Sequence, residues 1–258
     1  MSDLFSVEHK TVVITGGSGH LGGAVVKALL AGGAQVVNAS RRAAEPEPGY
    51  TGILLNIHCD VSKTESVCAM FAEAEKRFGR IDVLINCAVY GAVYGPDATV
   101  ERMSDDDFAL GMDGGAGTAF RCTREAIPYF KKAGRGNIIN FSSMYGVVSP
   151  DPSIYGVSGQ NSPVNYGVGK AAVLQLTRHS AAHLAQYNIR VNSVTPGPFP
   201  ILTRNPPQEF LDNLSNKTML KRIGQPEEVA GPVVFLASDA SSYMTGANIA
   251  IDGGWTAW

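Results

Sequence analysis

The sequence lacks any paired-cysteine pattern. Its four cysteines, Cys59, Cys68, Cys87 and Cys122, lie far apart and form no Cys-x-x-Cys motif. Structural zinc sites and disulfide frameworks depend on such pairs, so neither is expected here. We predict instead that the four thiols are small buried side chains in a reducing cytoplasm, and we predict no metal site.

Long hydrophobic runs and an excess of one charge are missing as well. No apolar stretch approaches the roughly 20 residues that a bilayer span needs. The opening MSDLFSVEHK carries acidic side chains in place of an apolar signal core. The formal net charge is −2, so no basic surface for nucleic acid is expected. These absences predict a cytoplasmic protein with neither nucleic-acid nor membrane partners.

What is present is an alternation of two periodicities. The 258 residues are 45% hydrophobic, which is enough for a large core. Helix-length segments with apolar residues at three- and four-residue spacing separate short β-branched runs. Alternating strands and helices predict an α/β fold, a doubly wound Rossmann domain over residues 1–258 with a mostly parallel sheet. The predicted strands, about seven, are 11–15, 35–39, 52–57, 81–86, 136–142, 189–194 and 247–252; the clearest helices are 21–32, 63–79 and 163–187.

A glycine-rich turn follows the first predicted strand, in the stretch TVVITGGSGHLGG. Gly16, Gly19 and Gly22 are the spaced glycines, and the helix that follows offers unpaired N–H groups and a positive dipole end to a pyrophosphate. Many glycine turns bind nothing, but the position between a first strand and a helix favours a dinucleotide site. Ser18, His20 and Leu21 belong to the same predicted site.

The end of the second predicted strand bears on the choice of cofactor. An acidic residue there binds the ribose 2′-hydroxyl of NAD, whereas arginine accommodates a 2′-phosphate. Ser40 stands where the acid is expected, and Arg41 and Arg42 follow it. This favours NADP(H), with NAD(H) as the alternative. The competing interpretation is a solvated turn that happens to hold two arginines.

Tyr166 and Lys170 stand four residues apart in a helical segment, so they share a face. A neighbouring ammonium favours the phenolate and is expected to lower the pKa of Tyr166 toward neutrality. Such a phenol can exchange a proton with an alcohol oxygen while hydride moves to or from a nicotinamide. Ser142 and Ser143 follow the fifth predicted strand, at the edge of the sheet where ligands of such folds bind.

These segments together resemble the short-chain dehydrogenase/reductase family, in its compact branch, over nearly the whole chain. The resemblance implies that Tyr166 is the general acid/base, that Lys170 lowers its pKa and binds the nicotinamide ribose, and that Ser143, in preference to Ser142, polarises the substrate oxygen. It also implies cofactor contacts from further segments. The matching segments are TGGSGHLG (15–22), CDV with Asp60 and Val61, NCA with Asn86 and Ala88, YGVGK (166–170), IRVNSVTPGP with Pro196 and Gly197, the backbone near Phe199, and the closing stretch 222–254.

The chain departs from the family pattern at two single positions. His20 replaces the middle glycine of the loop, and it either donates to a phosphate or lies in solvent. Gly115, within the helical segment 112–130, stands where the family has an asparagine that helps a water relay protons. The fourth catalytic member of the family therefore looks absent.

A third departure is length. Ser143 precedes Tyr166 by 23 positions, a longer interval than compact members show. We interpret residues 144–165 as an inserted substrate loop that carries Tyr145 and Tyr155, and residues 199–220 as a lid. Loops at this edge often carry specificity, although both can be plain connections. The SSMYG stretch also resembles sugar-modifying members, which favours a sugar-like or polyol substrate.

The predicted function is an NADP(H)-dependent oxidoreductase that transfers hydride between the nicotinamide and a secondary alcohol or ketone. The alternative from another class is a nucleotide-binding sensor or scaffold with little catalysis. A sugar epimerase or dehydratase is a third possibility, although such enzymes usually have a larger C-terminal lobe. By resemblance, the partners are a small-molecule substrate and further copies of the chain in a homotetramer or homodimer.

Overall fold

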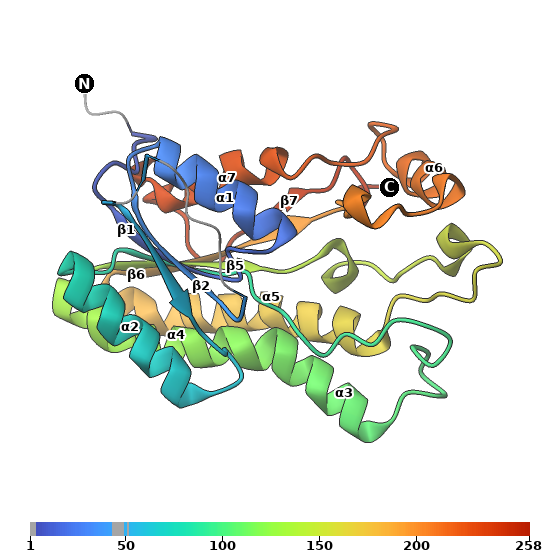
Figure 1. Ribbon diagram of the computed structural model, residues 1–258, viewed down its shortest axis with the longest axis horizontal. Helices are drawn as coiled ribbons and strands as arrows, with labels where there is room; N and C mark the ends of the chain where they lie inside the picture. Colours follow the sequence, from blue (N-terminus) through green and yellow to red (C-terminus); the bar gives the residue numbers. More distant parts are fainter. Residues whose placement is uncertain (1–3, 43–48, 51) are drawn as a thin grey trace.

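The computed structural model describes residues 4–42, 49–50 and 52–258. Its centre is a seven-stranded sheet in the order β3-β2-β1-β4-β5-β6-β7, and every neighbouring pair is parallel. Figure 1 shows helices on both faces of this sheet. The predicted Rossmann-type α/β fold is confirmed, and each predicted strand is found within a few residues of its expected bounds. The strands are β1 Thr11–Thr15, β2 Gln35–Ser40, β3 Leu54–His58, β4 Val83–Asn86, β5 Gly136–Phe141, β6 Ile189–Pro196 and β7 Asn248–Ile251.

The helices divide into two layers. In Figure 1, α1 (His20–Ala31) and α7 (Glu227–Ala237) lie together above the sheet, while α2 (Thr64–Phe78), α4 (Thr118–Ala133) and α5 (Val164–Leu184) cover the lower face. Two further helices, α3 (Asp105–Met112) and α6 (Gln208–Lys217), lie nearer one end of the molecule. Short turns of 3-10 helix complete the described elements: η2 Met144–Gly146, η3 Pro152–Tyr155, η4 Ala185–Tyr187, η5 Leu202–Arg204 and η6 Asp239–Ser241.

Side chains along the central strands alternate between the two faces of the sheet, and each face has its own hydrophobic core. In β1, Val13 belongs to the core beneath α2, α4 and α5, whereas Val12 and Ile14 belong to the core beneath α1 and α7. Successive side chains of a strand point to opposite faces, so a strand covered on both sides is mostly apolar, and the polar side chains in it are buried and hydrogen-bonded, as Asn140 is to Asn86. This is why the strand sequences read as continuous β-branched runs.

The predicted helical segment 112–130 has a different local structure. Residues Asp113–Gly117 form a π-helical turn, η1, between α3 and α4. A Cβ at Gly111 would meet the Asn165 side chain at 2.3 Å, and one at Gly115 would lie 3.5 Å from the Gly169 backbone. Gly111, in the last turn of α3, is therefore the glycine that the close approach to α5 requires, and the π-helical turn follows directly after α3.

The cysteines fit the prediction only in part. All four are free thiols, and Cys59 and Cys122 are buried as expected. Cys68 is exposed, which corrects that prediction, and its thiol donates to Glu125 at 3.3 Å. The reason is its position on the solvent-facing side of α2.

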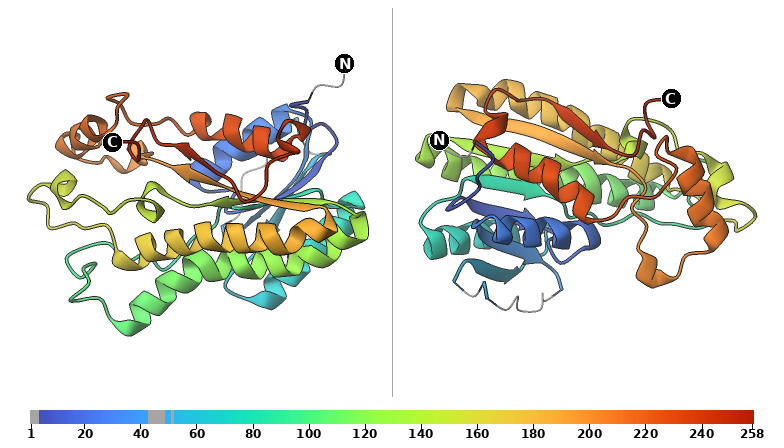
Figure 2. Two further views of the ribbon diagram at one scale, coloured as in Figure 1. Left: turned by 180° about the vertical axis from the view of Figure 1, so that it is seen from behind. Right: turned by 90° about the horizontal axis from the view of Figure 1, so that it is seen from above.

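One end of the molecule gathers most of the irregular chain. Figures 1 and 2 show the segment before α3, the segment between β5 and α5, and α6 at this end. Parallel strands direct their carboxyl ends to the same edge, which is where ligands bind in such folds. Among the described residues, no helix is both long enough and apolar enough to cross a membrane.

Candidate active site

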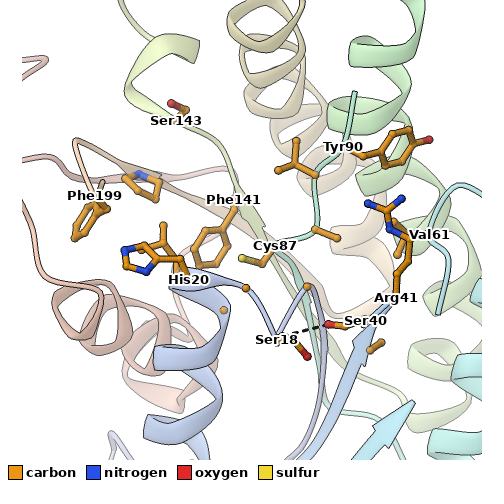
Figure 3. A pocket seen from close by; sticks show the side chains of 18 of the residues that line it. Ser18, His20, Ser40, Arg41, Val61, Cys87, Tyr90, Phe141, Ser143 and Phe199 are labelled. Atoms are coloured by element: carbon orange, nitrogen blue, oxygen red, sulfur yellow. Dashed lines mark hydrogen bonds between the residues drawn. The ribbon is translucent and has the colours of Figure 1, made fainter. Parts of the chain in front are cut away.

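A cavity of about 760 Å³ opens at the carboxyl edge of the sheet. The sheet order reverses between β1 and β4, and the cavity lies at this switch point. Residues from the ends of six strands and from α5 line it, and Figure 3 shows it from close by. Sixteen of the residues predicted from the sequence are in the lining: Gly16, Ser18, Gly19, His20, Leu21, Gly22, Ser40, Arg41, Val61, Ala88, Ser143, Tyr166, Lys170, Pro196, Gly197 and Phe199.

The glycine loop is shaped by close backbone packing. Gly16 has φ +73°, and a Cβ there would fall 2.9 Å from the backbone of Ala88. A Cβ at Gly22 would lie 2.3 Å from the Gly16 carbonyl oxygen. Only glycine fits both positions, so the loop stays low and the N-terminus of α1 faces the cavity. This cradle suits the pyrophosphate of a dinucleotide.

His20 is the first residue of α1 and lies beside Phe199 and Phe141 in Figure 3. Its Nε2 atom is buried and makes no hydrogen bond within the described part of the chain. A buried polar atom without a partner is costly, and a ligand in the cavity can satisfy it. The position disfavours the alternative of a solvated side chain.

Ser40 binds the glycine loop instead of reaching into the cavity freely. Its hydroxyl accepts from the Ser18 backbone N–H at 3.2 Å and donates to Asn38 Oδ1 at 3.3 Å. Arg41 extends past it along the cavity (Figure 3) and forms no ion pair among the described residues. An unpaired guanidinium at this point fits a ligand phosphate.

Two predicted residues lie outside the cavity lining. Asp60 accepts bonds from the Ser62 backbone and hydroxyl, and these bonds lower the pKa of its carboxyl. Asn86 is buried and donates to Asn140 at 2.8 Å. The Asp60 side chain thus holds the turn after β3, whereas Asn86 links β4 to β5, and neither residue lines the cavity.

The proton-transfer candidates converge where β5 meets α5. Ser142 donates to the Lys170 carbonyl oxygen at 2.9 Å, which commits its hydroxyl to holding the helix. The Ser143 hydroxyl accepts from the Tyr145 backbone N–H at 3.2 Å and lies close enough to the Tyr166 phenol to lower its pKa by hydrogen bonding. The structure thus separates the two serines and leaves Ser143 beside Tyr166.

Lys170 is 5% exposed, and its Nζ donates to the Phe141 carbonyl oxygen at 2.7 Å. Burial lowers the pKa of its amine to about 8. The amine lies 5.7 Å from the centre of the Tyr166 ring. It therefore faces the phenol as predicted, at the floor of the cavity.

The predicted direction of the Tyr166 pKa is wrong for the protein chain itself. Burial raises the pKa of Tyr166, and the hydrogen bond with Ser143 only partly opposes this. The amine of Lys170 is desolvated and donates to a backbone carbonyl, and it is not among the groups that shift the pKa of this phenol. At neutral pH the phenol is protonated.

Several lining residues were not predicted, chief among them Cys87, Tyr90 and Phe141. Cys87 and Tyr90 follow β4, next to the predicted Asn86 and Ala88, so strand-end position could have indicated them. Burial raises the pKa of the Cys87 thiol to about 11. The Cys87 thiol therefore stays neutral at physiological pH and lines the cavity near Lys170.

Comparison with known proteins identifies the family. The family model described as enoyl-(acyl carrier protein) reductase matches residues 18–256. The chain belongs to the short-chain dehydrogenase/reductase family. It is therefore an oxidoreductase that acts on CH–OH and C=O groups, and membership supports a nicotinamide cofactor.

Known relatives of this short-chain dehydrogenase/reductase match it over nearly its whole length. It is 34% identical to the 3-oxoacyl-[acyl-carrier-protein] reductase FabG of Thermotoga maritima, over 96% of this chain and 98% of that protein. It is also 34% identical to L-fucose dehydrogenase of Bos taurus, over 95% and 88% of the two chains. A short-chain dehydrogenase from Leptospira borgpetersenii with bound NAD+ superposes with a TM-score of 0.88 at 32% identity, covering 99% of this chain and 96% of that one.

Proposed function

We propose that this enzyme is an NADP(H)-dependent oxidoreductase that transfers hydride between the nicotinamide and a secondary alcohol or ketone. The observation that carries the proposal is the meeting of Tyr166, Ser143 and Lys170 in one cavity beside the glycine loop. When bound, the nicotinamide supplies or accepts the hydride. Pro196, Gly197 and Phe199 line the same part of the cavity and would hold its carboxamide end.

The protein's part is to hold the reacting oxygen and exchange its proton. Ser143 offers a hydroxyl to the substrate oxygen, and the Tyr166 phenol gives it a proton in reduction or accepts one in oxidation. The raised pKa of Tyr166 favours the protonated form, which is the form that ketone reduction uses. Lys170, held at Phe141, would bind the nicotinamide ribose and keep a cation available near the phenol.

The preference for NADP(H) rests on the adenosine end of the cavity. Arg41 and Arg42 line it, and Ser40 occupies the place of an acid that would repel a 2′-phosphate. His20 lies at the other end of the cavity, where its unpartnered Nε2 would donate to the pyrophosphate of either cofactor. NAD(H) is the alternative, and the Leptospira neighbour is described with NAD+ bound.

The substrate class is a sugar-like or polyol alcohol. An aromatic group lies beyond Ser143. Tyr145 meets Trp255 edge-on with ring centres 6.4 Å apart, and Tyr155 stacks on Phe210 with ring centres 5.6 Å apart. Aromatic faces with hydroxyl groups suit the mixed apolar and polar surface of a polyol. L-fucose dehydrogenase among the relatives acts on a sugar, which agrees with this class. We place the enzyme in the cytoplasm as a homotetramer or homodimer.

Replacing Tyr166 by phenylalanine tests the proposal. We expect turnover of polyols and ketones to fall by about 10²- to 10⁴-fold, because the ring stays but the proton donor is lost. Binding of NADPH, followed by its fluorescence, is expected to stay unchanged.

Undiminished turnover in Tyr166→Phe would exclude the proton-transfer role. Wild type that binds NADPH but turns over no member of the panel would favour the sensor or scaffold alternative. Tyr243→Phe, which removes the hydroxyl of a fully exposed tyrosine outside the cavity lining, is the matched control.

A further inference from the structure

Tyr90 is a cavity residue with no role in the proposed chemistry. It follows β4 and lies at the end of the cavity away from His20 and Phe199, as Figure 3 shows. The guanidinium of Arg41 points toward it, with the guanidinium carbon 5.9 Å from the ring centre. This is within the reach of a cation–π contact. Arg41 thus runs from the end of β2 across to the segment after β4.

The Tyr90 ring is itself held from the other side. Its hydroxyl donates to a carboxylate oxygen of Asp113, the first residue of the π-helical turn η1. Both oxygens of the same carboxylate accept from Arg121 Nη2, and the distance from Nη2 to Oδ2 is 2.6 Å. Burial and the bond to Asp113 raise the pKa of Tyr90 to about 12, so the phenol remains a donor at neutral pH.

The backbone of Tyr90 is confined too. A Cβ at Gly114, in the same π-helical turn, would fall 1.9 Å from the Tyr90 carbonyl oxygen. The DGGAG sequence of this turn therefore does two things at once: it presents the Asp113 carboxylate to the phenol and lets the turn lie directly against the Tyr90 backbone. The ring has little freedom. It faces a guanidinium that forms no ion pair among the described residues, although the Asp60 carboxylate is close enough to interact with it electrostatically.

We infer that Tyr90 is a specificity-determining residue that holds the Arg41 guanidinium across the adenosine end of the cavity, oriented for a ribose 2′-phosphate. The inference rests on the proposed preference for NADP(H). A long exposed arginine loses side-chain freedom when it binds a phosphate, and an arginine already held loses less. A ribose 2′-hydroxyl carries no charge that would pair with the guanidinium, so holding Arg41 in place increases the affinity only for the ligand with a 2′-phosphate.

Two adenosine probes test this without turnover. The dissociation constants of 2′,5′-ADP and 5′-AMP are measured by titration calorimetry for wild type, Tyr90→Leu, Tyr90→Phe, Arg41→Ala and the double variant Arg41→Ala/Tyr90→Leu. For Tyr90→Leu we expect 2′,5′-ADP to bind about fivefold more weakly, as loss of one cation–π contact implies. Binding of 5′-AMP is expected to stay near the wild-type value.

The remaining variants show whether a loss of 2′,5′-ADP affinity acts through Arg41. Tyr90→Phe keeps the ring but releases it from Asp113, so a smaller selective loss is expected; it also carries the test if Tyr90→Leu does not fold. In the Arg41→Ala background, Tyr90→Leu is expected to have no further effect on 2′,5′-ADP. Tyr243→Leu, at a fully exposed tyrosine outside the cavity, is the matched control.

The outcomes separate the two proposals. If Arg41→Ala leaves the ratio of the two dissociation constants unchanged, the NADP(H) preference is wrong and the inference falls with it. If Arg41→Ala weakens 2′,5′-ADP selectively but neither Tyr90 variant does, only the inference is overturned. Equal weakening of both probes by Tyr90→Leu would also overturn it, since Tyr90 would then only shape the site.

Discussion

At the scale of single residues, the most unusual feature is a buried lysine that forms no ion pair with a carboxylate in the described part of the chain. Lys170 is 5% exposed and has a backbone carbonyl as its hydrogen-bond acceptor. Desolvation disfavours its charged form, which is why the pKa of the amine falls to about 8. In an unfolded chain the same amine has its ordinary pKa of 10.5.

This difference predicts a pH-dependent cost. Below pH 8 the amine is charged in both the folded and the unfolded state, so the folded state bears the full cost of burying the charge. Between pH 8 and 10.5 only the unfolded state holds the proton, so the free energy of unfolding rises with pH. We expect Lys170→Met to be more stable than wild type at pH 7, by at most about 3 kcal/mol. Urea unfolding at pH 7, 9 and 10 should show this gap closing.

Lys27→Met, at an exposed lysine of α1, serves as the control and should show no such trend. A gap between wild type and Lys170→Met that stays constant across this range would contradict the desolvated amine.

At the scale of elements, the predicted substrate loop and the predicted lid are joined. The Lys217 amine of α6 pairs with the Asp151 carboxylate, Asn213 donates to the Ile154 carbonyl oxygen at 3.2 Å, and Tyr155 stacks on Phe210 at an interplanar angle of 20°. The pair with Lys217 lowers the pKa of Asp151 to about 2, so the ion pair persists through neutral pH. The loop and α6 therefore form one joined layer, and Tyr155 and Phe210 of the aromatic group belong to it.

We expect Tyr155→Ala to raise the KM for substrate about three- to tenfold, because one aromatic stack is lost from this layer. NADPH binding should not change, since neither ring lines the dinucleotide cavity. Phe210→Ala should have the same effect, and the double variant should add little. Fully additive effects on KM would show that the two rings act separately.

At the scale of the whole molecule, β7 is an edge strand of the sheet. Asn248 and Ala250 are exposed, and Ile249 and Ile251 are partly buried. An edge strand with so little charge invites pairing with another copy. The predicted homotetramer or homodimer would place this face against a partner.

The corresponding prediction concerns mass in solution. Ala250→Arg introduces a bulky charge on the exposed side of β7, and we expect light scattering to show a smaller particle than wild type. His58→Arg, on the opposite edge strand β3, should leave the mass unchanged. An unaltered particle for Ala250→Arg would exclude β7 from any interface.

The sequence by itself determined the layered α/β architecture. The sheet is parallel and covered on both faces, so its inner strands are rich in β-branched residues. The short runs TVVIT at 11–15 and GNIINFS at 136–142 predict β1 and β5 from local sequence alone. It also indicated Tyr166, Lys170 and the glycine loop, because their chemistry depends on spacing within one local element.

Only the tertiary structure decided which neighbours these residues meet. In the folded protein Ser142 donates to the backbone of α5, whereas Ser143 lies beside the phenol, and burial raises the pKa of Tyr166. Gly111 packs against the Asn165 side chain, a contact that no local pattern indicates. The tertiary structure also brought Arg41 to Tyr90 from strands that are separate in the chain. Burial and contacts between distant segments set these energies, and neither is encoded in a local pattern.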